Sequence, residues 1–341
     1  MKKIVACLLF WLGVLSSLPV LATNTDEGNA SEAFLRVDYA EVLLEMEPIA
    51  AQGNEDAQFV MGTLYENGYG VSKDYQIAAN WYRKAAEQGH VSAQFQLAVL
   101  YRYGEGVPQD DQQAGAWYLR AAEQGHADSQ NNLGWLYRNG YGFAQSYEDA
   151  LIWYKKAAEQ GHAVAQFNLG LLYDVGNGIS EDKLLAAYWY EKSATQGYAD
   201  AQFNLGLLYE DGSGVPQSFQ EAAFWYERAA IQGDSGAQNN LGVLYRNGLG
   251  VLQDYNKAAS LYQSAALQGY STAQNNLGAL YAEGSGVPKD DIRAHMWFNL
   301  ASFNGNTEAT KNRDAIAKRM TPHQVAQAQS LARQWLERYG E

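Results

Sequence analysis

Cysteine is almost absent from this 341-residue chain, and the only one is Cys7. Basic residues are also scarce, with 24 Lys and Arg against 38 Asp and Glu and a formal net charge of −14. A basic face is needed to release counterions from a phosphate backbone, so this balance argues against nucleic-acid binding as the main activity. With 47% hydrophobic and 18% charged residues, the chain can still bury a large core and is not a disordered acidic polymer.

Long apolar runs are missing beyond the N-terminus. There, two lysines precede an apolar run over residues 4–18, and Val20-Leu21-Ala22 offers a cleavage site before Thr23. Because roughly 15 apolar residues are short for a bilayer span, we expect residues 1–22 to be a secretory signal peptide rather than an anchor. The mature chain would then be periplasmic or secreted, with no membrane span, no disulfide and no cysteine metal site.

A period of 36 residues runs through the sequence without one insertion. Tryptophan recurs at six of seven equivalent positions, and Leu261 is the one substitution. The recurring glycines are Gly53, Gly89, Gly125, Gly161, Gly197, Gly233, Gly269 and Gly305, and the tryptophans are Trp81, Trp117, Trp153, Trp189, Trp225 and Trp297. A fixed period of this length indicates a repeat architecture.

The unit at residues 197–232 shows how each repeat folds. Apolar residues at helical spacing predict a first helix over residues 200–210 and a second over 219–232, separated by a turn that begins at Gly212. Gly206 lies in the middle of the first helix, where it costs about 1 kcal/mol in propensity, so it implies a close helix contact; Ala98 is the exception in this register. Such hairpins bury their apolar faces only by stacking, which predicts an all-α fold, an α-solenoid of seven hairpins.

The repeated segments resemble a known family. The pattern Ala-Gln-Phe-Asn-Leu-Gly-x-Leu-Tyr-x-x-Gly-x-Gly-Val, followed by Ala-x-x-Trp-Tyr-x-x-Ala-Ala-x-Gln-Gly, is similar to the Sel1-like repeat family, relatives of the tetratricopeptide repeat, over residues 53–304. The resemblance implies a right-handed superhelix that binds other proteins, in bacteria often exported and linked to envelope processes or host interaction.

A cysteine-rich branch of that family gives an alternative function. The resemblance to this branch implies β-lactam or peptidoglycan-fragment binding or hydrolysis. That branch staples each unit with a cysteine pair, which this chain lacks.

The two ends depart from the period. Residues 23–30 are polar and expected to be flexible, and residues 31–52 are expected to form an N-terminal capping helix, the second half of an incomplete unit. Residues 305–341 are expected to form C-terminal capping helices, because Thr321-Pro322-His323-Gln324 has the form of a capping box.

Enzymatic and metal chemistry find little support. Gly233-Asp234-Ser235-Gly236 resembles a serine-protease segment, but it lies in the register of a hairpin boundary. The Gly-x-Gly turns lack the third glycine or the Gly-Lys-Ser/Thr of nucleotide sites. His90, His126 and His162 share one register, and equivalent atoms of successive repeats are expected about 15–20 Å apart, which is too far for a shared metal. We therefore expect a non-enzyme without cofactor or metal.

Function is expected where the register is kept but the residue changes. By analogy with tetratricopeptide grooves, three variable columns on the first helices would line a concave wall and bind a protein or peptide partner. Aromatic anchors beside arginines are typical of binding hot spots, and guanidinium groups hold carboxylates well. The candidate residues are Phe95, Arg102, Tyr103, Trp135, Arg138, Phe167 and Leu171.

The sequence leaves two roles undecided, that of the candidate phenylalanines and that of a basic group near the C-terminus. Phe95 and Phe167 would alternatively pack between repeats. A basic group at Lys311, Arg313, Lys318 and Arg319 either docks an acidic partner or only solvates the C-terminal cap. We expect a monomer.

Overall fold

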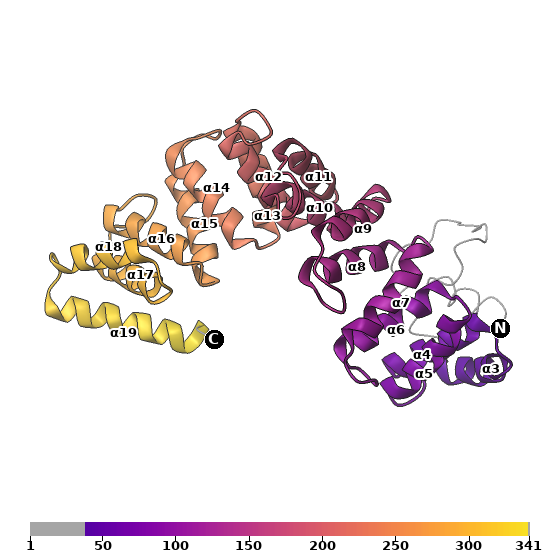
Figure 1. Cartoon of the computed structure of the whole chain (residues 1–341). Coiled ribbons are helices and arrows are strands. Elements are labelled where there is room, and N and C mark those ends of the chain that lie inside the picture. Colours follow the sequence, from indigo (N-terminus) through magenta and orange to yellow (C-terminus); the bar gives the residue numbers. More distant parts are fainter. Residues whose placement is uncertain (1–37, 340–341) are drawn as a thin grey trace, which may run out of the picture. The chain divides into compact units, whose positions relative to one another are not determined.

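The computed structural model describes residues 38–339, which form seventeen helices and no strand (Figure 1). The predicted signal peptide, the segment 23–30 and the first part of the segment 31–52 lie outside the described residues. No helix in the described range is both long and apolar enough to cross a membrane. The helices are α3 (Tyr39–Ala51), α4 (Glu55–Asn67), α5 (Tyr75–Glu87), α6 (Val91–Tyr103), α7 (Asp111–Glu123), α8 (Ala127–Asn139), α9 (Tyr147–Glu159), α10 (Ala163–Val175), α11 (Lys183–Thr195), α12 (Ala199–Asp211), α13 (Phe219–Ile231), α14 (Ser235–Asn247), α15 (Tyr255–Leu267), α16 (Ser271–Glu283), α17 (Asp291–Phe303), α18 (Thr307–Ala317) and α19 (Pro322–Tyr339).

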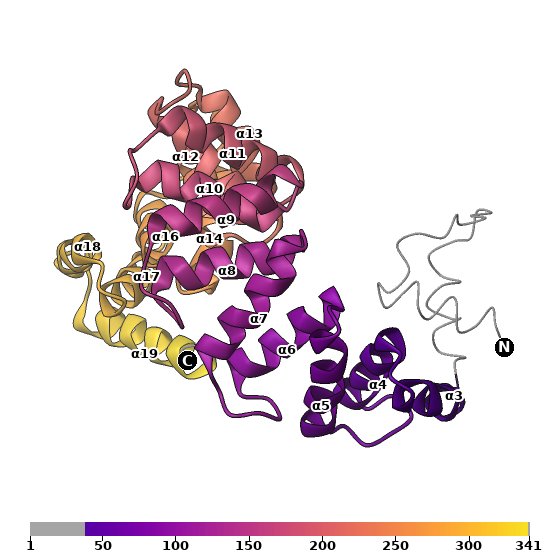
Figure 2. The ribbon, with the colours of Figure 1, turned by 45° about the vertical axis from the view of Figure 1, so that its right-hand side comes forward.

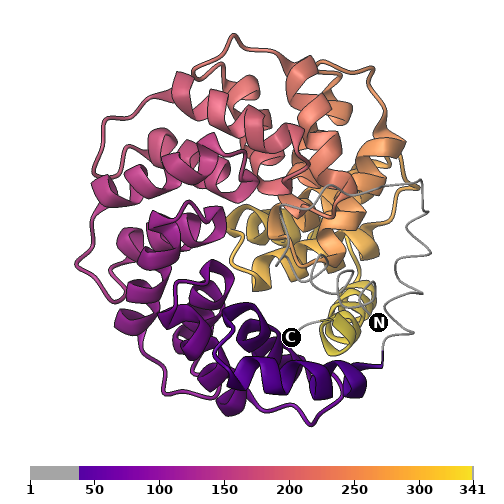
Figure 3. The same ribbon diagram turned by 90° about the vertical axis from the view of Figure 1, so that its right-hand side faces the viewer.

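Each repeat is a hairpin of two 13-residue helices, as the period predicts. The chain divides into two compact units, one ending at His162 and the other beginning at Ala163. In the first unit, consecutive helices pack against each other from α3 to α9 (Figure 2). The same order holds from α10 to α17 in the second unit, whose hairpins run from magenta to orange in Figure 3. The fold is an all-α solenoid of seven hairpins.

The ends of the helices follow from the residues that recur there. Second helices begin at an Asp or Ser whose side chain accepts a backbone N–H; Asp74, for example, accepts from the amides of Gln76 and Ile77. First helices end at a glycine in the left-handed conformation, such as Gly212 with φ of 72°. The turn that the sequence predicted at Gly212 is therefore confirmed.

A mid-helix glycine receives an aromatic ring from the partner helix of its hairpin. A Cβ atom on Gly206 would lie 2.6 Å from ring carbons of Tyr226, which is fully buried. Gly62, Gly134, Gly170 and Gly242 meet the equivalent tyrosines in the same way, and Gly278 meets Phe298. The close helix contact predicted from the recurrence of this glycine is thus confirmed, and it offsets the lost helix propensity.

The second glycine of each turn makes a contact between repeats. A Cβ atom on Gly214 would lie 2.2 Å from the carbonyl oxygen of Lys183, at the start of the second helix of the preceding repeat. Gly106 meets the backbone of Tyr75 at the same distance. Only glycine lets the turn of one repeat rest directly on the backbone of the repeat before it.

A glutamine ladder joins the hairpins inside the stack. The buried Gln202 donates through Nε2 to the carbonyl of Ala194, 3.0 Å away, at the end of the preceding helix. Its Oε1 accepts from Nε2 of Gln232, at 2.8 Å, at the end of its own hairpin. Because the buried amide is bonded on both sides, this polar group is not left unsatisfied in the core.

The two C-terminal helices, α18 and α19, pack on α17 of the last hairpin. Thr321 and Gln324 form the predicted capping box: the Thr321 amide donates to Oε1 of Gln324 at 2.8 Å, and the Gln324 amide donates to Oγ1 of Thr321 at 3.3 Å. Trp335 of α19 then packs edge-on against Trp297 of α17, with ring centroids 6.2 Å apart.

Replacing Gly206 by Leu tests the ring-on-glycine contact. The new side chain would displace the buried Tyr226 ring, so we expect a loss of about 1–3 kcal/mol or more in the free energy of unfolding, measured by urea denaturation. Asp211→Leu, at an exposed position of the same helix, is the control and should change stability little. A Gly206→Leu chain as stable as the control would contradict the contact.

Candidate functional site

The structure divides the seven candidate residues between the two units. Phe95, Arg102 and Tyr103 lie on α6 and Trp135 and Arg138 on α8, all in the first unit. The other two candidates, Phe167 and Leu171, lie on α10 in the second unit. Each group is therefore described within its own unit.

The side chains of Arg102, Tyr103, Trp135 and Tyr141 form an aromatic–arginine cluster in the first unit. The guanidinium carbon of Arg102 lies 3.9 Å from the centroid of the Trp135 ring and 5.6 Å from that of Tyr103. The other partner of Trp135 is Tyr141, whose ring is stacked on it at 5.1 Å and 8°. Tyr103 is 65% and Tyr141 is 46% exposed, so the cluster presents aromatic surface and a positive charge to solvent.

Tyr141 was not among the residues predicted from the sequence. This residue lies in the turn between Gly140 and Gly142, both with φ near +70°, which brings the chain back over the end of α8. The sequence shows a tyrosine between the two glycines of a turn, which could have indicated an exposed aromatic ring. Its position in the repeat does not show that this ring reaches Trp135.

The two candidate phenylalanines pack between repeats. Phe95 lies 5.8 Å from the ring of Tyr118 and 4.9 Å from that of His126. In the second unit, Phe167 makes the same pair of contacts with the rings at positions 190 and 198, at 5.8 and 5.1 Å. Both side chains are half-buried, as is Leu171, which packs on the same cluster as Phe167. Little of either ring is left for a partner.

The third variable column has a structural role that its sequence did not reveal. In the first six repeats, each residue of this column lies near the hydroxyl of the buried tyrosine sixteen positions later. Tyr82 donates to Oε2 of Glu66 at 2.5 Å, and Tyr226 donates to Glu210 at the same distance. Burial raises the pKa of Tyr82 well above its usual value, and the neighbouring carboxylate raises it further.

Where the column holds an arginine, the buried tyrosine hydroxyl faces a positive charge instead of a carboxylate. Burial raises the pKa of Tyr154 to about 12, while the positive charge of Arg138 acts in the opposite direction. Burial raises the pKa of Tyr118 to about 12 as well, and here Arg102 opposes it. In the last repeat, Phe298 replaces the buried tyrosine and has no hydroxyl. The column position sixteen residues earlier is Ala282, which has no polar side chain.

Two arginines of the column differ from the third in their ion pairing. In the second unit, Arg246 forms an ion pair with Glu283 at 3.1 Å. Over the described residues, neither Arg102 nor Arg138 forms an ion pair, and both are half-buried. In the first unit, both guanidiniums of this column therefore lack a carboxylate partner, within an acidic chain.

The basic group near the C-terminus is partly used within the second unit. Arg319 binds the carboxylate of Asp291 through two bonds of 2.9 and 2.7 Å. Arg313 pairs with Asp314 at 2.8 Å. These bonds favour the interpretation in which the group stabilises the cap.

Comparisons with known proteins decide the family. A model described as "Sel1 repeat" matches seven consecutive segments, at residues 55–90, 91–126, 127–162, 163–198, 199–234, 235–270 and 271–306. The chain belongs to the Sel1 repeat family. The matched repeats begin two residues later than the predicted frame at 53–304, because a period can be divided at any of its residues. Sel1 repeat proteins generally act as scaffolds for protein–protein interaction and are generally not enzymes.

Two solved structures are similar over nearly the whole Sel1 chain. One is c5321, a protective antigen present in uropathogenic Escherichia coli strains that displays an SLR fold; it is 32% identical, with a TM-score of 0.60, over 99% of this chain and 84% of that one. The other is a Sel1 repeat protein from Oxalobacter formigenes, 33% identical, with a TM-score of 0.65, over 91% of this chain and 86% of that one. Comparison with the curated proteins gives no match.

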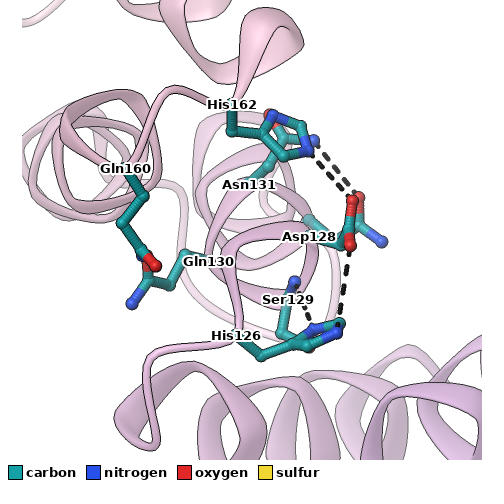
Figure 4. A network of polar contacts seen from close by, with 8 residues as sticks. His126, Asp128, Ser129, Gln130, Asn131, Gln160 and His162 are labelled. Carbon is teal, nitrogen blue, oxygen red and sulfur yellow. Dashed lines mark hydrogen bonds and ion pairs between the residues drawn. The ribbon is translucent and has the colours of Figure 1, made fainter. Parts of the chain in front are cut away.

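Histidines cap the first helices of two Sel1 repeats in the first unit. Nδ1 of His90 accepts the amide of Ala93 at 3.1 Å. In the next repeat, Nδ1 of His126 accepts the amide of Ser129 at 3.2 Å, as Figure 4 shows. This geometry needs an unprotonated Nδ1, so the caps require neutral imidazoles. In the equivalent position of other repeats, Asn54 makes the same bond.

The predicted separation of the histidines is wrong. His126 and His162 approach the same carboxylate, that of Asp128: Nε2 of His162 lies 3.0 Å from Oδ1, and Nε2 of His126 lies 3.9 Å from Oδ2 (Figure 4). The predicted distance of 15–20 Å followed from the spacing of helix axes. The side chain of His162, however, reaches back to Asp128 at the start of the first helix of its repeat. Even so, no group of three or more metal-binding side chains in residues 38–339 is arranged to hold an ion.

The histidine caps predict a pH dependence of stability. Burial is the main cause that lowers the pKa of both His90 and His126 from about 6.5, against the opposing charges of Asp56 and Asp128. The unfolded chain then binds more protons than the folded one, so the caps stabilise fully above pH 6.5 and lose this contribution as the pH falls below that value.

Asparagine substitutions separate this effect from other titrations. The His90→Asn and His126→Asn double variant keeps a cap of the Asn54 type but cannot be protonated. We expect the midpoint of thermal unfolding to fall less between pH 7.5 and pH 5.5 in the variant than in the unchanged chain. Equal losses in the two chains would show that carboxylates alone cause the pH dependence.

Proposed function

We propose that this Sel1 repeat protein is an exported scaffold that binds an anionic segment of a partner protein at the aromatic–arginine cluster of its first unit. The observation that carries the proposal is the pair Arg102 and Arg138, which have no carboxylate partner among the described residues, with Arg102 beside the exposed ring of Tyr103. Elsewhere the same column holds an acidic residue, the ion-paired Arg246 or the uncharged Ala282. A carboxylate of the partner would receive charge-assisted hydrogen bonds from these guanidiniums.

The aromatic rings would supply the apolar part of the interface. The guanidinium of Arg102 already lies over the ring of Trp135, so it loses little freedom on binding. Tyr103 and Tyr141 present large exposed surfaces with a polar end, as interface hot spots commonly do. Phe95, Phe167 and Leu171 would contribute through packing of the stack rather than through contact with the partner.

Export is the second element of the proposal. The lysine pair, apolar run and Val20-Leu21-Ala22 support a cleaved signal peptide and a periplasmic or secreted destination. The similarity to a protein described as a protective antigen supports a role in the envelope or in contact with a host.

Substituting both arginines by alanine tests the binding site. A photo-crosslinking amino acid placed at the exposed Tyr103 should trap the partner in living cells, and Arg102→Ala with Arg138→Ala should lower the recovered adduct at least tenfold, because the carboxylate loses both guanidiniums. Arg246→Ala is the matched control: it removes an arginine of the same column, which is paired with Glu283. Undiminished crosslinking in the double variant would remove this site from consideration.

The export proposal has a separate test. Sequencing the N-terminus of the protein recovered from the periplasm or medium should give a mature chain that begins at Thr23. A block of cleavage is expected from Ala22→Phe, since the signal peptidase accepts small residues there. Unprocessed chain confined to the cytoplasm would contradict export while leaving the binding site open to its own test.

A further inference from the structure

A cavity of about 300 Å³ lies in the second unit, on residues of α13, α14 and α15. Its apolar wall includes Leu241 and Leu261, and Ile231 is 80% exposed at its rim. The volume is at the small end of ligand pockets and suits a single large side chain. The full lining consists of Glu227, Ala230, Ile231, Gln238, Leu241, Tyr245, Lys257, Ser260, Leu261 and Ser264.

The preceding repeat shows what fills this space elsewhere. Trp225 is only 7% exposed and packs in one hydrophobic cluster with Ala194, Leu205 and Tyr209. In the first unit, Trp117 is 8% exposed and also packs in the core. A tryptophan in this register therefore fills the stack.

One period after Trp225, the tryptophan is missing. Ala230, Leu241 and Tyr245 are the residues that follow Ala194, Leu205 and Tyr209 by 36 positions, and all three line the cavity. The residue in the tryptophan register is Leu261, the only one of the seven that is not a tryptophan. The cavity therefore occupies the space that an indole ring fills in other repeats.

The cation that accompanies the tryptophan is missing as well. A Lys or Arg follows the tryptophan three residues later in each of the first five repeats, at Lys84, Arg120, Lys156, Lys192 and Arg228. The charged group lies over the ring at 4.0 Å for Lys84 on Trp81 and at 3.9 Å for Lys156 on Trp153. Leu261 is instead followed by Ser264, so this repeat lacks both members of the aromatic–cation pair.

We propose that a partner polypeptide supplies the missing pair, by inserting a tryptophan into this cavity with a basic residue three positions after it. The inference rests on the proposed function only in taking the ligand to be a polypeptide, since it uses other residues in the other unit. Ser260 and Ser264 line the cavity with hydroxyl groups that can accept an indole N–H.

Charge at the rim favours a basic neighbour for the tryptophan. Glu227 is exposed there and forms no ion pair over residues 38–339. Lys257, the basic residue of the lining, lies 4.9 Å over the ring of Tyr245. The carboxylate of Glu227 thus remains to attract the partner's cation, which would take the place that Arg228 has beside Trp225 in the preceding repeat.

The direct test uses the tetrapeptide acetyl-Trp-Ala-Ala-Lys-amide with the purified chain. Methyl NMR should show shifts confined to Ile231, Leu241, Leu261 and their neighbours. Acetyl-Leu-Ala-Ala-Lys-amide is the matched peptide, and it should bind at least tenfold more weakly. Equal affinity for the two peptides, or shifts centred elsewhere, would overturn the proposal.

Variants of the chain sharpen the test. Leu261→Trp fills the cavity from within, so we expect at least a tenfold loss of peptide affinity with no decrease in the thermal midpoint. Trp225→Leu with Arg228→Ser should open a second cavity and raise the stoichiometry from one peptide to two, and this outcome does not depend on the folding of the first variant. Unchanged affinity in Leu261→Trp, or no second site in the double variant, would contradict the inference.

Two further measurements distinguish this inference from two alternatives, peptide binding at the aromatic–arginine cluster and occupation of the cavity by a second copy of the chain. The chain with Arg102→Ala and Arg138→Ala should bind the tetrapeptide with unchanged affinity, and a parallel loss would assign peptide binding to the aromatic–arginine cluster instead. Sedimentation of the unchanged chain, with and without the peptide, tests a second copy as the occupant. A dimer that the peptide dissociates would replace the partner polypeptide by a second copy and overturn the proposal.

Discussion

The fold depends on close backbone and ring contacts at glycine, which fix how each repeat lies on its neighbour. Gly206 admits the ring of Tyr226 within a hairpin, and Gly214 lets a turn rest on the backbone of Lys183 in the repeat before. Neither contact leaves room for a Cβ atom, so a shift by one residue would place a side chain where none fits. The unbroken period of 36 residues follows from this constraint. Positions outside these contacts are then free to vary.

Buried tyrosines impose a second condition on the variable positions. In the first six repeats, the residue sixteen positions before each buried tyrosine is a carboxylate or a guanidinium, and Glu66 and Glu210 accept hydrogen bonds from the hydroxyls. The hydroxyls of Tyr154 and Tyr262, which face arginines, have no hydrogen-bond partner among the described residues. Arg102 and Arg138 therefore have two roles. Each lies near a buried tyrosine hydroxyl, and each guanidinium also offers a positive charge to a partner protein. This dual role explains why a column that stabilises the core can also vary in charge along an acidic chain.

The period made most of the fold predictable, because each local signal is repeated seven times. Helix ends, the contact at Gly206 and the capping box at Thr321 all follow from propensity and spacing. Contacts between repeats were harder to predict. That Tyr141 covers Trp135, or that His162 reaches Asp128, depends on where side chains of different repeats meet, and the register does not contain this information.

Departures from the period are the most informative residues of such a chain, since each one has internal controls at the same position. Phe298 lacks the hydroxyl, and Ala282 lacks the polar side chain that would face it, so neither member of this pair needs a polar partner. Leu261 and Ser264 also change together, but both become smaller and no other side chain takes the space, which stays open as a cavity. The first pair of changes is compensated within the chain. The second is not, and an apolar surface without internal compensation is where a group from outside the chain gains most by binding.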